Sequence, residues 1–298
     1  WAPLWCRLRR RLRRAARLMQ GAEFFVTSAL NMSVAGLIAD ALPHGLVVPM
    51  AGLANGKLGG HEVWNGFEHF FIVLFRLLEM AEILGREELV HGRRRVARAE
   101  FHPEAADVGF SDGVLHRADV LLWALEKSGA GGAAPRVAEL GAHEAECSSR
   151  LLASSPNLTW LGVDAYGTTG DYGQGGPEAA DAPKWLQEAR RRLSPWLGVG
   201  RAHLVVGDSA AAASGVAEGS LDLLFVDGDH SRQGTARDLK AWVPCVRPGG
   251  AVAGHDYSMS FPGVVEAAHD ALPPNSTLHL SLDNVFWWYK PGGVGAEA

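Results

Sequence analysis

The chain has 298 residues, 47% of them hydrophobic, so it can bury one large core or two smaller ones. Its formal net charge of −5 gives no overall attraction to nucleic acid or to an anionic membrane, and we expect no nucleic-acid partner. The three cysteines are odd in number and far apart, which argues against a disulfide framework. No C-x-x-C or H-E-x-x-H spacing occurs, which disfavours a thiolate zinc site and zincin chemistry.

The first 19 residues contain seven arginines and no acidic residue, with Leu4, Leu8 and Leu12 at helical spacing. This pattern is typical of a basic amphipathic helix that directs targeting or contacts a membrane surface. A solvated helix or arm is the alternative interpretation. The apolar run from Phe24 to Ala39, followed by an A-x-A-like site, faintly resembles a secretory signal. The compartment stays open between the cytoplasm and an organelle.

The next stretch divides into an irregular part and a helix. Residues 43–66 are rich in Gly, Pro and Asn and show no period. The segment Glu68–Leu84 predicts a mostly buried helix, because it is apolar apart from one polar stripe, formed by Arg76, Glu79 and Glu82. The arginines at 93–95 and 98 indicate a solvated linker. We therefore expect a mostly helical or irregular extension over 1–105 and a second domain over 106–298.

From residue 111 onward the pattern alternates regularly between helices and strands. The expected helices cover 112–127, about 142–153, 184–193, 231–243 and 263–272, with a short alanine-rich helix after Ser209. The expected strands cover 137–140, 160–163, 203–206, 221–226, 251–254, 277–282 and 285–289. Pro248-Gly249-Gly250 predicts a turn, and Asp283-Asn284 predicts a tight hairpin between the last two strands. Residues 165–183 are expected to form a long loop.

Polar side chains follow the ends of successive expected strands. Glu139, Asp164 and Asp208 come first, then Asp227-Gly228-Asp229-His230 and His255-Asp256-Tyr257. In open α/β sheets the ligand binds beyond the carboxyl ends of the strands. We therefore interpret these tips as the floor of an active site.

The array suits an adenosyl ligand, whose ribose hydroxyls bind best to a carboxylate at the second strand's end. Glu139 and Asp164 are 25 residues apart, near the spacing expected for that carboxylate, and Gly141 lets the backbone approach a ligand closely. The G-x-G-x-x-G fingerprint is absent and the loop is acidic, which disfavours phosphate-bearing cofactors. S-adenosylmethionine, with its cationic sulfonium, fits better. The residues expected to bind it are Glu139, Gly141, Ala142, His143, Asp164, Ala165, Asp208, Ser209 and Asp227.

Five segments together resemble the class I S-adenosylmethionine-dependent methyltransferases, closest to methyltransferase family 24. They are VAELGAHEAECS (137–148), WLGVDAY (160–166), VVGDS (205–209), LLFVDGDHSRQGTARDLKAW (223–242) and RPGGAVAGHDY (247–257). The resemblance implies a Rossmann-like α/β sheet of seven strands that ends in an antiparallel hairpin. It also implies methylation of a small-molecule acceptor, with a hydroxyl as the expected position (O-methylation). Ala145 replaces the usual second glycine of the first motif, and Cys147 stands where serine is common.

The resemblance extends to metal-dependent catechol-type and macrolide sugar O-methyltransferases. It implies a metal-binding site for Mg²⁺ or a similar divalent cation at Asp227 and Asp256, with His255 or Asp229 as further ligands. Such an ion prefers oxygen ligands, and it would lower the pKa of the acceptor hydroxyl. His230 stands where catechol-type enzymes place a basic residue, so it is the expected general base, with Asp227 as the second catalytic residue.

Plainer roles stay open for the same residues. Asp227 and Asp229 could cap the following helix, Asp208 could cap its own, Asp164 could be a turn residue, and His255 could bond a neighbouring loop. Trp287 and Trp288 are expected to pack in the sheet. A second hypothesis for the whole chain is a catalytically lapsed methyltransferase fold that serves as a binding or scaffold module. A nicotinamide-dependent dehydrogenase is disfavoured, and a homodimer is one possible assembly.

Overall fold

The computed structural model describes residues 23–26, 76, 79–80, 83, 98–102, 108–109, 114–115, 117–130, 134–167, 177–281 and 283–292. The expected basic helix at 1–19, the irregular stretch 43–66 and the arginines at 93–95 lie outside these residues. None of the described helices is both long and apolar enough to span a membrane.

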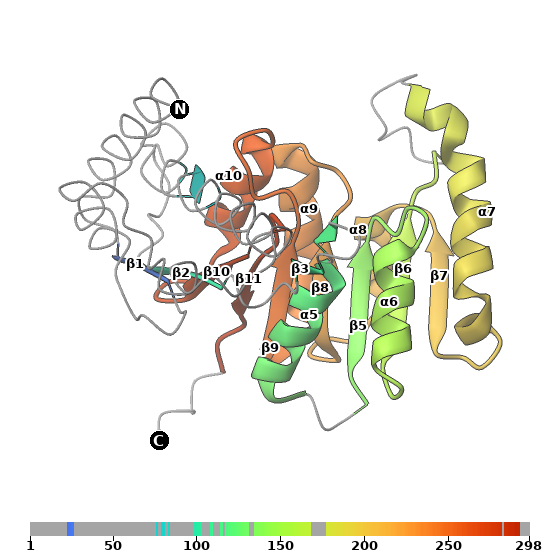
Figure 1. The fold of residues 1–298 in the computed structure, drawn as a ribbon, viewed down its shortest axis with the longest axis horizontal. Helices are drawn as coiled ribbons and strands as arrows, with labels where there is room; N and C mark the ends of the chain where they lie inside the picture. The colour runs from blue at the N-terminus through green and yellow to red at the C-terminus, as the bar shows by residue number, and fades with distance from the viewer. Residues whose placement is uncertain are drawn as a thin grey trace, which may run out of the picture.

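A single large sheet organises the described part of the chain (Figure 1). Its strand order is β1-β2-β10-β11-β9-β8-β5-β6-β7, and in this sheet β11 alone runs antiparallel to its neighbours. The strands are β1 (Glu23–Val26), β2 (Arg98–Phe101), β5 (Arg136–Leu140), β6 (Thr159–Asp164), β7 (Ala202–Val206), β8 (Leu221–Val226), β9 (Val246–Gly254), β10 (Thr277–Leu280) and β11 (Phe286–Tyr289). The short strands β3 (Val108–Gly109) and β4 (Val114–Leu115) pair separately.

The sequence-predicted seven-stranded sheet with its antiparallel C-terminal hairpin is confirmed as β5 to β11. Numbered by their own sequence, the five parallel strands from β7 to β9 lie in the doubly wound order 3-2-1-4-5. The order in which successive strands join the sheet therefore reverses between β5 and β8, and an open α/β sheet forms its ligand crevice at that reversal. Beyond the hairpin, β2 and β1 extend the sheet in parallel with β10.

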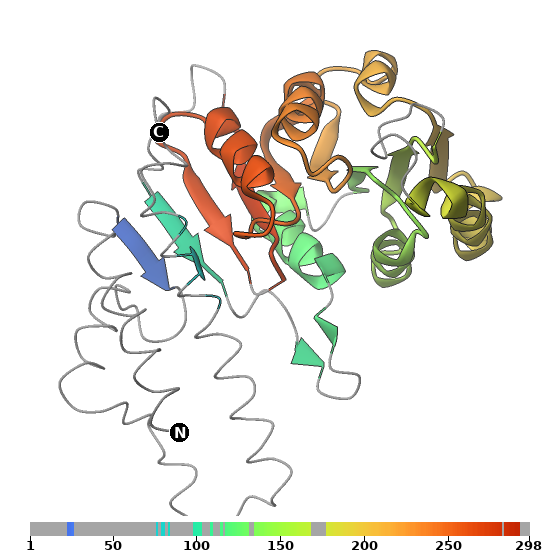
Figure 2. The same cartoon turned by 90° about the horizontal axis from the view of Figure 1, so that it is seen from above.

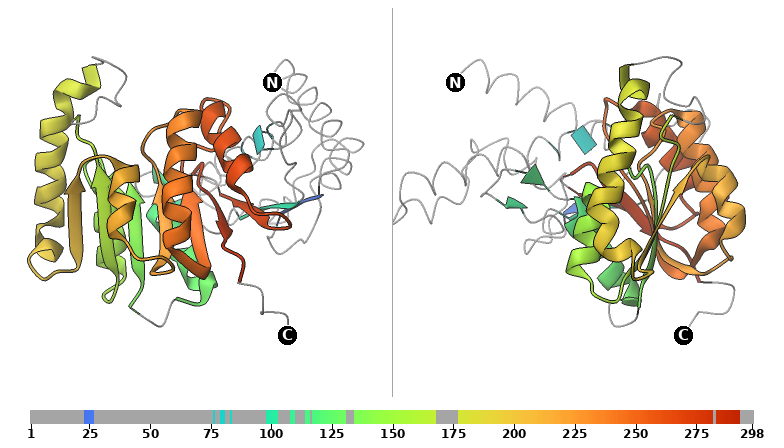
Figure 3. Two further views of the ribbon diagram at one scale, coloured as in Figure 1. Left: turned by 180° about the vertical axis from the view of Figure 1, so that it is seen from behind. Right: turned by 90° about the vertical axis from the view of Figure 1, so that its right-hand side faces the viewer.

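Helices cover both faces of the sheet, as Figures 2 and 3 show. One layer holds α5 (Arg117–Leu125), α6 (Glu146–Ser154) and α7 (Pro177–Leu197), and the other holds α8 (Ser209–Ala212), α9 (Arg232–Trp242) and α10 (Pro262–Ala271). Short single turns follow α5 at Glu126–Ala130, α8 at Ala213–Gly215 and α9 at Val243–Cys245. This three-layer arrangement buries both faces of the central parallel strands β5, β8 and the second half of β9, which are mostly apolar, whereas the edge strand β7 is partly exposed.

The core lies between these layers. In β8, every residue except Asp222 is buried, which matches the compact apolar run seen in the sequence. Trp160, Trp242, Trp287 and Trp288 are fully buried, so the expected packing role of Trp287 and Trp288 is confirmed.

Several element boundaries differ from the sequence-based prediction. The turn predicted at 248–250 is instead part of β9, which begins at Val246; Gly249 supplies a φ of 75° there, and the pairing with β8 shifts register. Helix α7 begins at Pro177 rather than at 184, so Pro183 lies inside the helix and does not start it. The hairpin connection is longer than two residues, because β10 ends at Leu280 and β11 begins at Phe286.

The described positions before residue 105 are helical or extended. Arg76, Glu79, Met80 and Ile83 are helical, and Met80 and Ile83 are fully buried, as the mostly buried helix at 68–84 predicts. Arg98 was expected in a solvated linker, but it lies in β2 and pairs with Thr277, although its side chain is exposed. Parallel pairing with β10 therefore overrides the linker-like charge pattern at this position.

Candidate active site

The carboxyl ends of β5, β6, β7, β8 and β9 meet around one cleft. A cavity of about 600 Å³ is lined by residues from all five strand ends, including Gly141, His143, Asp164, Ala165, Asp208, Ser209, Asp227, His230, His255 and Asp256. An adjoining cavity of about 210 Å³ shares Gly141, His143 and Asp227 and adds Glu139 and Ala142. Every residue that the sequence predicted as a cofactor-binding residue, a general base or a metal ligand therefore lines one of these two adjoining cavities.

At the floor of the cleft the ends of the parallel strands β5 and β8 lie in close backbone contact. The Asp227 N–H donates to Leu140 O at 2.8 Å, and the Gly141 N–H donates to Val163 O at 2.9 Å. Gly141 has a φ of 89°, and a Cβ there would lie 2.1 Å from Asp227 O. Only glycine can hold the two strand ends this close. The close approach of this backbone to a ligand stays a prediction.

Asp164 organises the loop that follows β5. It accepts hydrogen bonds from the backbone N–H groups of His143 and Tyr166, each at 2.8 Å, while the Tyr166 hydroxyl donates to His143 O at 2.7 Å. His143, Ala145 and Tyr166 all have positive φ, at 46°, 58° and 41°. The turn role left open for Asp164 is thus real, and its carboxylate still lines the cleft. Ala145, which stands where the family resemblance leads us to expect glycine, adopts a left-handed conformation that costs a non-glycine residue energy.

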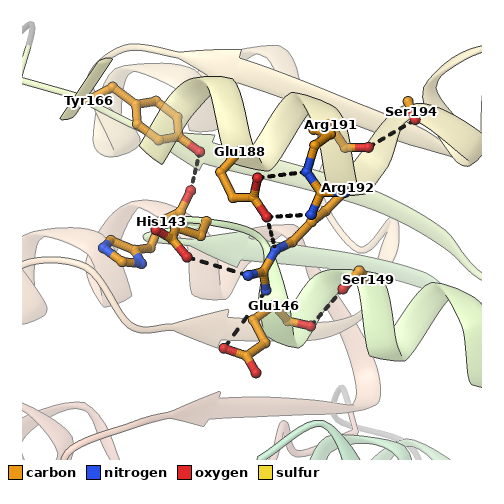
Figure 4. A network of polar contacts seen from close by, with 9 residues as sticks. His143, Glu146, Ser149, Tyr166, Glu188, Arg191, Arg192 and Ser194 are labelled. Atoms are coloured by element: carbon orange, nitrogen blue, oxygen red, sulfur yellow. Dashed lines mark hydrogen bonds and ion pairs between the residues drawn. The ribbon is translucent and has the colours of Figure 1, made fainter. Parts of the chain in front are cut away.

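Helix α7 clamps the same loop from outside, as Figure 4 shows. Arg192 donates to Glu188 on its own helix at 2.7 Å and reaches across to Glu144 at 3.4 Å and Glu146 at 3.8 Å. The ring of Trp185, also on α7, lies 4.4 Å from the ring of His143. These contacts hold the loop in place over the cleft, and Trp185 becomes part of the cleft wall.

Glu139 is buried beneath the cleft and turned toward the core. One of its oxygens accepts from the Ser148 hydroxyl at 2.6 Å and from the Trp160 indole N–H at 2.7 Å. Burial raises the pKa of Glu139 to about 7, although these two hydrogen bonds oppose the shift. Its carboxyl can therefore exchange a proton near neutral pH.

Asp208 and Ser209 stand at the end of β7 and support the cleft through α8 and α9. Asp208 caps α8 by accepting from the Ala211 N–H at 2.7 Å, and it pairs with Arg237 at 2.5 Å. The Ser209 hydroxyl donates to Asp238. The capping role left open for Asp208 is confirmed, and it coexists with a place in the cleft wall.

Asp227, at the end of β8, is held by two cationic groups. Arg117, the first residue of α5, donates to Asp227 at 2.5 Å, and His255 Nδ1 lies 3.5 Å from Asp227. Burial alone would raise the pKa of Asp227, but hydrogen bonds from His230 and His255, with the charge of Arg117, hold it well below its usual range. Asp227 is therefore an ionised, paired carboxylate and not a helix cap.

His255 is nearly enclosed by carboxylates. It lies 3.1 Å from Asp256 and 3.8 Å from Asp283. Burial disfavours its charge, yet hydrogen bonds to Asp227, Asp256 and Asp283 raise the pKa of His255 to about 11. In this arrangement His255 is a cation that pairs with the surrounding carboxylates.

His230 is more exposed than His255, with 42% of its side chain exposed. Its Nε2 lies 3.0 Å from Asp256 Oδ2, and its ring packs 4.9 Å from the ring of Phe261. Hydrogen bonding to Asp227 raises its pKa, against the effect of burial. Asp229, by contrast, accepts from the Ser231 N–H at 2.7 Å, just before α9. Ser231 itself caps the helix by accepting from the Gly234 N–H at 3.0 Å, so the capping alternative for Asp229 is wrong.

Several residues of the site were not found from the sequence, among them Arg117, Trp185 and Asp283. Arg117 contacts Asp227, and Asp283 lies 3.8 Å from His255; both contacts join residues far apart in the chain, and no local motif marks them. Trp185 could have been nominated, because it is an aromatic residue in the first turn of the helix expected after the long loop.

Comparison with known proteins places the fold and the cleft in context. Residues 149–257 match the model of a family described as a methyltransferase domain. Similar solved structures include the O-methyltransferase NovP, with a TM-score of 0.46 and 18% identity, covering 59% of this chain and 80% of that chain. CalS11, a TDP-rhamnose 3'-O-methyltransferase, has a TM-score of 0.39 and 20% identity, and the match covers 56% of this chain and 77% of that chain. Cofactor-bound Rv0187 from MTB has a TM-score of 0.42 and 14% identity, and the match covers 72% of this chain and 90% of that chain.

No curated protein sequence matches the chain. The family match falls within the doubly wound sheet and includes the strand ends that form the cleft from β6 to β9. The part of the chain that forms these strand ends is therefore similar to a methyltransferase domain.

Proposed function

We propose that the chain transfers the methyl group of S-adenosylmethionine to a hydroxyl of a small-molecule acceptor. The observation that carries the proposal is the single cleft at the strand ends, which joins the expected cofactor residues to an exposed imidazole–carboxylate pair. The cofactor supplies a methyl group bonded to a positively charged sulfur. All other functions in the reaction fall to residues of the chain.

The cleft suits this cofactor in shape. Its volume of about 600 Å³ lies within the range of small-molecule sites. Gly141 lines the cleft, and the missing Cβ lets its backbone lie directly against the end of β8. Asp164 lies at the end of the second strand of the order, where a ribose hydroxyl would find a carboxylate acceptor.

The charges of the cleft favour the same class of ligand. Asp164, Asp208, Asp229 and Asp238 line it on the β6 to α9 side, facing the cationic Arg237. A ligand that carries an ammonium and a sulfonium group gains from this excess of carboxylates, whereas a dinucleotide pyrophosphate would be repelled.

His230 is positioned to take the proton of the acceptor hydroxyl. Because its Nε2 faces Asp256, Nδ1 is the nitrogen left to accept that proton, and Asp256 stabilises the imidazolium that results. The hydroxyl oxygen then forms the new bond to the methyl carbon as the carbon–sulfur bond breaks. The chain's remaining contribution is to hold oxygen, carbon and sulfur in line.

The expected Mg²⁺ ion would compete with Arg117 for the carboxylate of Asp227. Ligand atoms of Asp227, His230 and Asp256 lie within 4.8 Å of one another, a spacing that a metal ion can span. Magnesium requires near-octahedral oxygen ligands, however, and one of the two carboxylates already pairs with Arg117. The residues in this arrangement do not fit Mg²⁺, so we propose a reaction that relies on His230 and on the fixed cations Arg117 and His255.

Methyl release from labelled S-adenosylmethionine, measured over a panel of small hydroxyl compounds with and without Mg²⁺, tests the proposal. We expect turnover on at least one acceptor, and equal rates after treatment with a chelator. Cofactor binding without turnover on any acceptor would favour the lapsed, scaffold-type protein instead. The strained Ala145 in the cofactor loop is the feature that would favour that second function.

A further inference from the structure

A second group of metal-type side chains lies where β2 meets β10, and it shares no residue with the cleft. Glu100 belongs to β2, His102 follows that strand, and His279 belongs to β10. Parallel pairing places Glu100 opposite His279, and the His102 N–H donates to Leu280 O at 2.8 Å, so the pairing continues past β2. Because residues two apart on a strand share a face, all three side chains point to one place.

The three donor atoms form a compact triangle. His102 Nε2 lies 2.9 Å from His279 Nδ1, and Glu100 Oε2 lies 3.8 Å from the first and 3.7 Å from the second. The circle through the corners of such a triangle has a radius of about 2.0 Å, which is the length of zinc–nitrogen and zinc–oxygen bonds. One ion can therefore reach all three atoms, and shifts of about half an ångström would bring them to the spacing of about 3.3 Å between ligands of tetrahedral zinc.

The protonation of the group suits a cation as well. Burial, assisted by Lys127, lowers the pKa of His102 to about 4, and burial with the charges of His102 and Arg98 lowers that of His279 to about 3. Both imidazoles are therefore neutral at physiological pH, which is the form that binds metals. Arg98 donates to the other oxygen of Glu100 at 2.6 Å and leaves Oε2 facing the two imidazoles.

Aromatic rings surround the group and hold the imidazoles in orientation. The His102 ring lies 4.8 Å from Trp123 of α5, and the His279 ring stacks on Trp287 at 5.3 Å with Tyr289 at its edge. Side-chain exposure falls from 14% for Glu100 to 6% for His102. The group is thus preorganised and largely dry, yet it is open to solvent on the Glu100 side.

We propose that Glu100, His102 and His279 form a Zn²⁺ site that fastens β2 to β10. Two imidazoles and a carboxylate are a zinc donor set, and water would complete the tetrahedron. Magnesium and calcium are disfavoured because they prefer oxygen ligands. The site crosses from β2, before residue 105, to the sheet of the methyltransferase domain, so an ion there would link the two along the sheet edge. The proposal does not depend on methyl transfer.

Zinc titration of the metal-stripped full chain, in competition with a chromophoric chelator, tests this proposal. The variants are His102→Gln and His279→Gln, which keep side-chain size but remove a ligand nitrogen. His203→Gln, on the exposed face of the far edge strand β7, is the matched control. His230→Gln identifies any ion that binds in the cleft instead. Cobalt in place of zinc gives a second readout through the visible absorption of its four-coordinate complex.

We expect one high-affinity zinc ion per chain, with a tetrahedral cobalt spectrum and a rise in melting temperature on zinc addition. Each of the His102 and His279 variants should weaken zinc binding at least tenfold, while the His203 and His230 variants keep it. Circular dichroism and S-adenosylhomocysteine binding must be retained, which shows that the variants fold. Absence of zinc binding in the wild type, or wild-type affinity in a folded His279→Gln variant, would leave a hydrogen-bonded histidine pair and overturn the proposal.

Discussion

Replacing Gly141 by alanine is the sharpest perturbation of the cleft floor. The new methyl carbon would lie 2.1 Å from Asp227 O, 2.6 Å from Asp227 C and 2.8 Å from Gly228 Cα, all of them backbone atoms that cannot rotate away. The backbone φ of 89° adds a cost of about 1–2 kcal/mol for a residue with a Cβ. Overpacking adds about 1–3 kcal/mol, so the free energy of unfolding should fall by about 2–5 kcal/mol.

The matched control is Gly228→Ala on the facing strand end. A Cβ at Gly228 would lie 3.8 Å from its nearest neighbours, which is ordinary van der Waals contact. Urea denaturation of the two variants and the wild type gives the free energies, and titration with S-adenosylhomocysteine gives the affinities. Gly141→Ala should lose both stability and binding, while Gly228→Ala should stay within about 1 kcal/mol of the wild type in stability. Equal stability of the two variants would refute the close backbone contact between Gly141 and the end of β8.

Three further predictions concern single side chains. His230→Gln should lower turnover by about 100-fold or more without changing affinity for S-adenosylhomocysteine, because it removes only the base; an unchanged rate would exclude that role. Arg117→Met should free Asp227, so that manganese binds in the cleft of the variant, as relaxation of water protons would detect, but not in that of the wild type. Glu139→Gln should become more stable than the wild type as pH rises. The pKa of Glu139 is about 7 in the folded protein and 4.5 in the unfolded chain. As pH rises from 4.5 to 7, the unfolded chain therefore loses the Glu139 proton before the folded protein does, and the wild type loses up to about 3 kcal/mol of stability that the glutamine variant keeps. Urea titrations at pH 5 and pH 8 measure the difference, and a constant difference would contradict the burial of the carboxyl.

The parts of the site that could be predicted from the sequence are those written into local patterns. The apolar run Leu221–Val226 followed at once by Asp227 marks a buried parallel strand and its polar tip, and the same signal located Asp164. Parallel strands place their carboxyl ends at one edge of a sheet, so tips far apart in the sequence meet in one cleft.

The parts that sequence analysis missed depend on long-range pairing. Arg117 and Asp227 are 110 residues apart, and His102 and His279 are 177 apart, so no spacing rule connects them. Strand β2 was read as a charged linker because its edge pairing with β10 is decided by tertiary contacts and not by propensity. Pro183 misplaced the start of α7, since proline usually marks the first turn of a helix but here lies inside one.

Calorimetric titration of the full chain with S-adenosylhomocysteine tests the central claim most directly. Asp164→Ala, which removes the carboxylate at the end of β6, and Asp181→Ala, a control whose side chain is 47% exposed on α7, complete the series. We predict one site per chain for the wild type and the control, a loss of at least tenfold in affinity for Asp164→Ala, and no binding of NADH. Absence of heat with the wild type, or undiminished affinity in Asp164→Ala, would contradict a nucleoside pocket at the strand ends.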